Sequence, residues 1–321
     1  MPFNSPSVVI RQDLAALPTN LTGYIGDIVL PPVTVPTKTG ARNWMLAVTG
    51  GSATTNRTPS GTVTRTIQTS NIQAFTTVEN RGGFLMDQGE IANFGTQDAY
   101  EAALALTGTK QVRDQSEARV VAATIGAGIG IGAGTVAAPL APTGAGTHAS
   151  PYVQTTTDIH GDIFNGLHNA VLALRPFGKV AIFGGVTAIN TVRQDPTVIE
   201  RMRGLVGAAS GEQVRSISAD QLALIFEADK VELAITLSAI WPTNRVGVIA
   251  VPEAGLDPIM VFQAGRRLVY NWALEAGAPQ PLICKRGYDP ATDSEFLDVV
   301  AYDAAYIANG NMIGSLSLDG N

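Results

Sequence analysis

Hydrophobic and polar positions change their spacing several times along the chain, and each spacing predicts a different element. Between Pro151 and Arg175, apolar residues recur every three or four positions, which predicts an amphipathic helix. From Thr62 to Ser70 and from Gln73 to Glu79, apolar residues are separated by threonines and other polar residues, which predicts two strands of a ribbon. Two strands alone are marginally stable in water, so we expect this ribbon to dock on a partner surface.

Residues 25–40, near the N-terminus, form an apolar segment with three prolines and a final glycine. Each proline fixes φ and removes an amide donor, so we expect an extended segment through which no helix runs. Val29, Val33 and Val35 favour strand geometry. The segment therefore suits an arm that lies on the rest of its subunit or on a neighbouring subunit.

A long helix is predicted from about Thr96 to Thr124, with Thr96 as its N-cap. One apolar face of this helix is traced by Tyr100, Leu104, Val112, Ser116, Val120 and Ala123. Arg113 and Glu117 lie four residues apart, and we expect them on the solvated side. Gly108 weakens the prediction that the helix is continuous.

The second half of the chain alternates helices with short apolar strands, which indicates an α+β fold. Asp195 and Pro196 predict a helix start, and Ser218 with Gln221 has the form of a capping box before another helix. The predicted strands are 179–183, 232–238, 245–251, 258–262, 297–302 and 312–318.

Composition favours assembly into a larger particle. Charged residues make up 15% of the 321 residues, against about 25% in an average soluble protein. A chain with so few charges is better suited to extensive subunit contact than to full solvation. The net charge of −6 argues against a general nucleic-acid-binding surface.

The stretch from Val120 to Thr147 carries no charge, which raises the question of a membrane span. Alternating glycines and two prolines predict instead a helix end followed by a Gly/Ala-rich loop, so we expect no membrane partner. Residues 128–133 fit a G-x-G-x-x-A pattern, but they follow a helix instead of a strand. We therefore expect no nucleotide cofactor.

No set of residues has the spacing of a catalytic or metal site. His160 and His168 are eight residues apart, which does not suit shared metal ligation, and we expect them on a helix surface or at an interface. Cys284 lies in a strand-like run and is expected to be a small buried hydrophobe. We predict a protein that is not an enzyme, and a soluble enzyme with a Gly-rich site stays as an alternative.

The order of these elements resembles that of tailed-phage major capsid proteins of the Hong Kong 97 type. In that family an arm ending in prolines, a short apolar run and a glycine leads into a long β-hairpin, the E-loop, and then into a spine helix. The similar pieces are the arm at 25–40, a spine-helix end at Gln111–Ala123, axial-domain pieces at Phe177–Gly185 and Thr187–Arg203, and closing strands at Asp298–Gly314.

The resemblance implies a division of the chain into an N-terminal arm (1–40), an E-loop hairpin (41–95), a peripheral-domain spine helix with a Gly/Ala-rich loop (96–150), a mainly axial domain (151–255) and return strands (256–321). It also implies hexamers and pentamers of an icosahedral shell that packages double-stranded DNA. Expected partners are copies of the chain itself and separate scaffolding, portal and decoration proteins. The implied location is the virion, assembled in the host cytoplasm. An encapsulin-like compartment that encloses an enzyme is an alternative.

Several residues are candidates for contacts between subunits. The charged residues of the ribbon could pair with a neighbour, and a tryptophan at its foot could anchor it: these are Arg57, Arg65, Glu79, Arg81 and Trp44. A solvated loop explains the same charges almost equally well. The family's shells expand during maturation and their spine helix straightens, so Gly108 is a candidate position for helix flexing.

Overall fold

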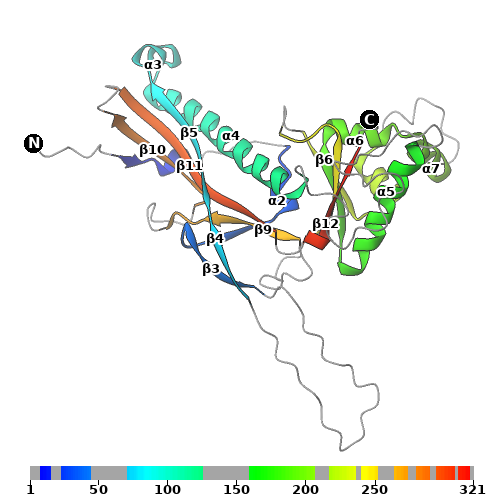
Figure 1. Cartoon of the computed structure of the whole chain (residues 1–321). Coiled ribbons are helices and arrows are strands. Elements are labelled where there is room, and N and C mark those ends of the chain that lie inside the picture. The colour runs from blue at the N-terminus through cyan, green and yellow to red at the C-terminus, as the bar shows by residue number, and fades with distance from the viewer. Residues whose placement is uncertain are drawn as a thin grey trace, which may run out of the picture.

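The structure is a computed structural model, and it describes residues 8–15, 23–44, 71–125, 159–206, 217–235, 240–251, 264–273, 280–289, 294–307 and 310–318. A six-stranded sheet with one long helix forms one part of the subunit (Figure 1). A four-stranded sheet with several helices forms the other part, and a two-stranded ribbon leaves the body between them.

The six-stranded sheet is built around its longest strand, β11. One edge of β11 pairs antiparallel with β5, and the other edge pairs with β10 and β9. The members are β1 (Val9–Ile10), β2 (Pro32–Val35), β5 (Val78–Met86), β9 (Gly265–Tyr270), β10 (Leu282–Asp289) and β11 (Ser294–Ile307). The chain returns to the body at Val78, where β5 joins this sheet.

The N-terminal segment lies on its own subunit. β1 pairs with the edge of β10, α1 (Gln12–Ala15) follows it, and β2 pairs parallel with β9. The prediction of an extended segment from residue 25 is wrong at its start, because α2 (Gly26–Val29) is a single helical turn. This turn is complete before Pro31, whose missing amide would interrupt a longer helix.

The predicted long helix is confirmed as α4 (Gln97–Thr124), which is continuous through Gly108. The Thr96 side chain accepts a hydrogen bond from the amide of Ala99 at 3.3 Å and so caps the first turn. A shorter helix, α3 (Gln88–Phe94), precedes it, and Gly95 makes the turn between them with a φ of +81°. α4 lies across β5 and β11 (Figure 1).

The four-stranded sheet has the order β12-β8-β6-β7. Its strands are β6 (Val180–Gly185), β7 (Lys230–Ala234), β8 (Arg245–Ala250) and β12 (Ile313–Ser317), with 3-10 turns at Arg175–Phe177 and Gly310–Met312. The helices around it are α5 (Ile159–Leu174), α6 (Val186–Arg193), α7 (Pro196–Val206) and α8 (Ala219–Phe226). Both helix starts predicted here are confirmed: Asp195 accepts from the amides of Thr197 and Val198, and Ser218 forms a capping box with Gln221.

One large apolar core joins the two parts of the subunit. It fills the space between the four-stranded sheet and α5, and it also includes the end of α4 at Val120 and Ile125 and the α2 residue Val29. The arm and the long helix therefore share a core with the four-stranded sheet, which holds the two parts together.

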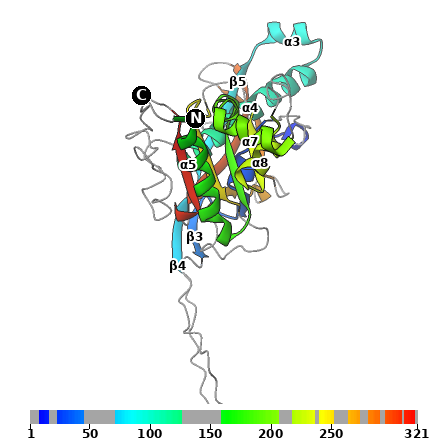
Figure 2. The same cartoon turned by 90° about the vertical axis from the view of Figure 1, so that its right-hand side faces the viewer.

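The ribbon consists of β3 (Thr39–Trp44) and β4 (Asn71–Thr76), paired antiparallel from Thr39↔Thr76 to Trp44↔Asn71. β3 and β4 leave the body on the side away from α3, as both views show (Figures 1 and 2). The predicted strands at 62–70 and 258–262 lie outside the described residues. Predicted domain limits at residues 40 and 95 fall just inside β3 and just after α3.

Candidate functional site along the long helix

The middle of α4 packs against β5 through two glycines. A Cβ atom at Gly82 would lie 2.7 Å from the Gly108 Cα, and a Cβ at Gly108 would lie 2.6 Å from Val299 Cγ2 and 3.2 Å from Phe84 Cε2. Such distances are shorter than side chains tolerate, so both positions need the absence of a side chain. Close packing is thus one reason for glycine at 108, and helix flexing there stays a prediction.

Near its beginning, α4 buries a carboxylate. Glu101 has no exposed side-chain surface, and its oxygens form ion pairs with Arg11 of the arm and, at 3.0 Å, with Arg286 of β10. Gln97 donates a further hydrogen bond at 3.0 Å. A buried carboxylate with two cations is costly to break, because removing a partner leaves an uncompensated charge. Glu101 therefore ties the arm and the sheet to α4.

A second polar cluster lies where α4 crosses β11. The buried Asp303 of β11 accepts hydrogen bonds from Ser116 and Arg119 of α4, and from Asn80 of β5 at 2.8 Å. Arg119 also donates to the Asn80 side chain at 2.8 Å. Arg267 of β9 donates to Ser116, so four elements meet in one hydrogen-bonded network.

Glu117 is buried, which contradicts the prediction that it pairs with Arg113 on the solvated side. It is 4% exposed and accepts hydrogen bonds from the Ile25 amide at 2.9 Å, the Gly26 amide at 2.9 Å and the Trp241 indole at 3.0 Å. Arg113 instead pairs with Asp27 at 3.0 Å.

Burial is the main cause that raises the pKa of Glu117, against the lowering effect of its hydrogen bonds. The carboxylate is therefore costly to keep charged and remains charged only where its donors stay in place. Through these hydrogen bonds, Glu117 links α2 and the side chain of Trp241 to α4.

The C-terminal end of α4 is capped by the other sheet. Arg245, the first residue of β8, is buried and donates a hydrogen bond at 3.0 Å to the carbonyl oxygen of Ile125. A cation at this position satisfies an unpaired carbonyl and interacts favourably with the helix dipole. The two ends of α4 are therefore fixed to different sheets.

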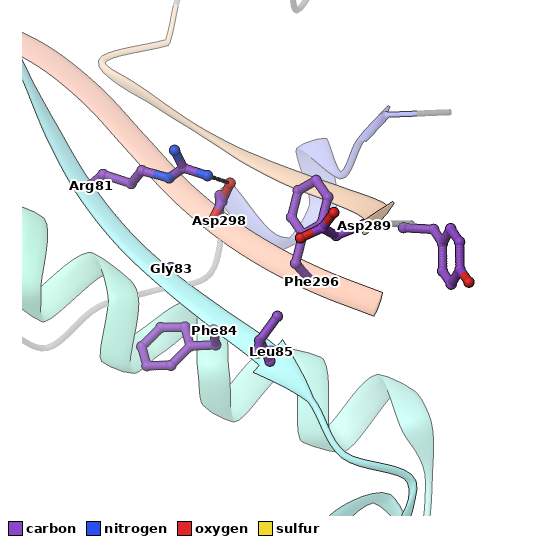
Figure 3. A pocket seen from close by; sticks show the side chains of 8 residues that line it. Arg81, Gly83, Phe84, Leu85, Asp289, Phe296 and Asp298 are labelled. Carbon is purple, nitrogen blue, oxygen red and sulfur yellow. Dashed lines mark hydrogen bonds and ion pairs between the residues drawn. The ribbon is translucent and has the colours of Figure 1, made fainter. Parts of the chain in front are cut away.

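The sheet face away from α4 carries an open groove of about 500 Å³ (Figure 3). Arg81 and Asp298 form an ion pair at one end, and Phe296 and Asp289 lie at the other (Figure 3). Leu85, which lines it, is 58% exposed. The groove is therefore an apolar surface with a charged rim that stays open among the residues the structure describes.

Two of the predicted contact residues, Glu79 and Arg81, lie in β5 of the six-stranded sheet, so their predicted place on the ribbon is wrong. Arg81 pairs with Asp298, and its backbone amide and carbonyl both bond to the Gln115 side chain. Glu79 accepts a hydrogen bond from the Tyr302 hydroxyl at 2.6 Å. Trp44 ends β3, and Arg57 and Arg65 lie outside the described residues. Contacts of these residues with a neighbour stay a prediction.

Sequence reasoning missed the residues that hold α4 in place, namely Glu101, Glu117, Asp303, Arg119, Arg267 and Arg245. The available indication was that Glu101 and Glu117 lie on or beside the predicted buried face, next to Tyr100 and Ser116. A charged residue at such a position indicates a buried partner, although its identity depends on contacts distant in sequence.

Other candidate chemistry is limited in the part of the chain that the structure describes. His168 is half-buried on α5 and stacks on Phe164 with ring centroids 5.4 Å apart, so a position at an interface stays a prediction. Cys284 is fully buried, as predicted, and burial raises its pKa to about 11. Among the described residues there is no group of three or more metal-ligating side chains. None of the helices in the described ranges combines the length and apolarity needed to cross a bilayer.

The fold can be compared with known proteins. No family model and no curated protein matches the sequence. A phage-related protein from Bordetella bronchiseptica RB50 matches with a TM-score of 0.58 and 13% identity over 97% of this chain and 98% of that chain. The mature capsid of bacteriophage PhiM1 matches with a TM-score of 0.52 and 11% identity over 89% and 84%.

A structure of Mycobacterium phage Bobi matches with a TM-score of 0.51 and 14% identity over 95% of this chain and 94% of that chain. These similarities extend over most of the length of both chains in each case. The chain therefore has the Hong Kong 97-type fold of phage capsid proteins, as its element order predicted.

Proposed function

We propose that this chain is the major capsid protein of a tailed phage, which forms hexamers and pentamers of an icosahedral shell around double-stranded DNA. The observation that carries the proposal is a capsid fold over nearly the whole chain, with a ribbon that leaves the body. In the described part of this ribbon, Ile72 is 72% exposed. If each ribbon contacts the next subunit around a ring, exposed apolar side chains such as Ile72 become buried. Repeated contacts of this heterologous kind would close the shell.

Charge supports contact between the ribbon and a neighbouring body. From Thr39 to Val78 the charged residues are Arg42, Arg57 and Arg65, and there is no acidic residue. This segment carries +3 within a chain of −6, so the rest of the chain carries −9. A basic ribbon on an acidic neighbour is favourable, and exposed pairs of this kind weaken as salt is added.

The proposal includes the partners expected from the resemblance: separate scaffolding, portal and decoration proteins, with assembly in the host cytoplasm. Each contact between subunits can be weak, because a closed shell makes many of them together. An encapsulin-like compartment is the second candidate and would differ in enclosing an enzyme. The proposed role is structural, with no catalytic step and no cofactor.

Negative-stain electron microscopy of the protein expressed alone tests the proposal, with nucleic-acid absorbance measured on the same fraction. Closed shells, tubes or rings of five and six subunits are the expected result. An enclosed protein in place of nucleic acid would favour the encapsulin-like alternative. If the protein stays monomeric or dimeric, also with candidate scaffolding proteins, the shell proposal is wrong and the enzyme alternative reopens.

A further inference from the structure

Lys38 connects the base of the ribbon to the body through its backbone. It lies between β2 and β3, and its carbonyl oxygen accepts hydrogen bonds from the Thr77 amide at 2.8 Å and the Thr77 hydroxyl at 2.9 Å. Thr77 separates β4 from β5. Hydrogen bonds between Lys38 and Thr77 therefore join the two strands of the ribbon at the point where they leave the body.

The Lys38 side chain lies among three aromatic rings of the body. Its ammonium nitrogen is 4.2 Å from the ring centroid of Tyr302, 4.9 Å from that of Trp272 and 5.4 Å from that of Tyr270. The rings also contact one another, with centroids 5.1 to 6.2 Å apart. A cation over aromatic faces within about 6 Å is attracted by the ring quadrupoles, more strongly where water is excluded.

The cage formed by Tyr270, Trp272 and Tyr302 is itself firmly placed. Tyr270 and Trp272 are at most 4% exposed and pack with Ile283 and Val300 of the sheet. Ile10 of the arm packs on the same cluster. The cage is therefore a fixed part of the body on which both the arm and the ribbon base rest.

We propose that Lys38 is a positioning residue: its ammonium, held in this cage, fixes the direction in which β3 and β4 leave the body. The consequence for assembly rests on the proposed function, in which the ribbon overlaps a neighbouring subunit. An apolar side chain could fill the same space, but only a cation gains from facing three ring surfaces at once. The direction of the ribbon is thus set by a charge instead of by backbone pairing alone.

Hydrogen exchange of the unassembled subunit tests the placement directly. In Lys38→Met, which keeps the length but removes the charge, we expect amide exchange in Thr39–Trp44 and Asn71–Thr76 to rise about tenfold, equivalent to about 1.4 kcal/mol. Lys38→Arg keeps the cation and should exchange like the wild type. Unchanged exchange in Lys38→Met would overturn the proposal.

Lys285 offers a matched control, because its ammonium lies 5.1 Å from the Trp272 centroid but belongs to β10 of the body. Lys285→Met should leave exchange of the ribbon base unchanged. An equal rise in both methionine variants would mean that the cations stabilise the aromatic cluster generally, which contradicts a specific role for Lys38. If Lys38→Met fails to fold, Tyr302→Leu must raise exchange while Tyr302→Phe, which keeps the ring, must not.

The yield of closed shells is a second measurement, and it should not change if Lys38 only stabilises the subunit. Lys38→Met should lower the yield of closed shells several-fold, with the thermal midpoint of the subunit within about 2 °C of the wild type, and Lys38→Arg should restore the yield. If Lys38→Met forms regular shells in the same yield as the wild type, the inference that Lys38 directs the ribbon for assembly is wrong. The exchange experiment does not need shells, so failure of the proposed shell function is distinguishable from failure of this inference.

Discussion

Gly108→Ala tests the packing of α4 on β5. Two opposing effects set its magnitude. Alanine favours a helix interior over glycine by about 1 kcal/mol. The new Cβ would lie 2.6 Å from Val299 Cγ2, and overpacking of this kind costs about 1–3 kcal/mol. Because a valine side chain in a strand is stiff, α4 itself must shift, and we expect a net loss of about 1 kcal/mol.

Urea unfolding of the unassembled subunit, followed by circular dichroism, measures this loss. Gly204→Ala is the matched control, because a Cβ at this α7 position would meet no atom within 4 Å. The control should show only the gain in helix propensity. If Gly108→Ala is stabilised as much as Gly204→Ala, the tight contact does not exist and this reasoning fails.

A second substitution separates packing from flexing. Val299→Ala creates space, so the double variant Gly108→Ala/Val299→Ala should show a favourable coupling of about 1–2 kcal/mol. If glycine is needed only for packing, shells of the double variant should expand like the wild type. If the double variant is well packed but fails to expand, flexing at Gly108 is supported.

Three further results are expected. Burial raises the pKa of Glu117, so the folded state binds this proton more tightly than the unfolded chain. The free energy of unfolding should therefore fall as the pH rises from the ordinary glutamate pKa to the raised folded one, and Glu117→Gln should remove that fall in urea titrations across pH. Cys284 should resist thiol reagents in the native state and react on unfolding, because it is buried with a pKa of about 11. Replacing Arg57 and Arg65 together by glutamine should lower shell yield several-fold at low salt and flatten its salt dependence, measured by light scattering.

Each of these three predictions can be contradicted by a specific result. The pH dependence must differ between wild type and Glu117→Gln, and rapid labelling of native Cys284 would show that the strand opens readily. For the ribbon, Lys179→Gln with Arg203→Gln removes the same charge from exposed positions of the body. If this control variant lowers shell yield as much as the ribbon variant does, the loss of yield is due to net charge and not to contacts of the ribbon.

Local chemistry made several elements predictable from the sequence. The N-cap at Thr96, the Asp195 start and the Ser218 capping box each involve residues two or three positions apart, so the sequence contains both partners. The apolar stripe of α5 was equally clear.

The anchors of α4 were not predictable in the same way. Its buried face includes Glu101, Thr109, Ser116 and Glu117, so no apolar stripe marks the whole face. The partners of Glu117 are more than 90 residues away, and Ser116 bonds to a residue 187 positions later. Without those partners, a charged residue on a helix favours the solvated side, which explains the wrong prediction for Arg113 and Glu117.

The capped ends of α4 have a mechanical consequence. Ion pairs at Glu101 fix one end to the six-stranded sheet, and the hydrogen bond from Arg245 fixes the other end to the four-stranded sheet. A helix of 28 residues is about 42 Å long, so a tilt of about 5° moves its far end by about 4 Å. In the proposed shell, a small rotation of α4 at one end of the subunit would therefore change the contacts of a neighbouring subunit at the other end.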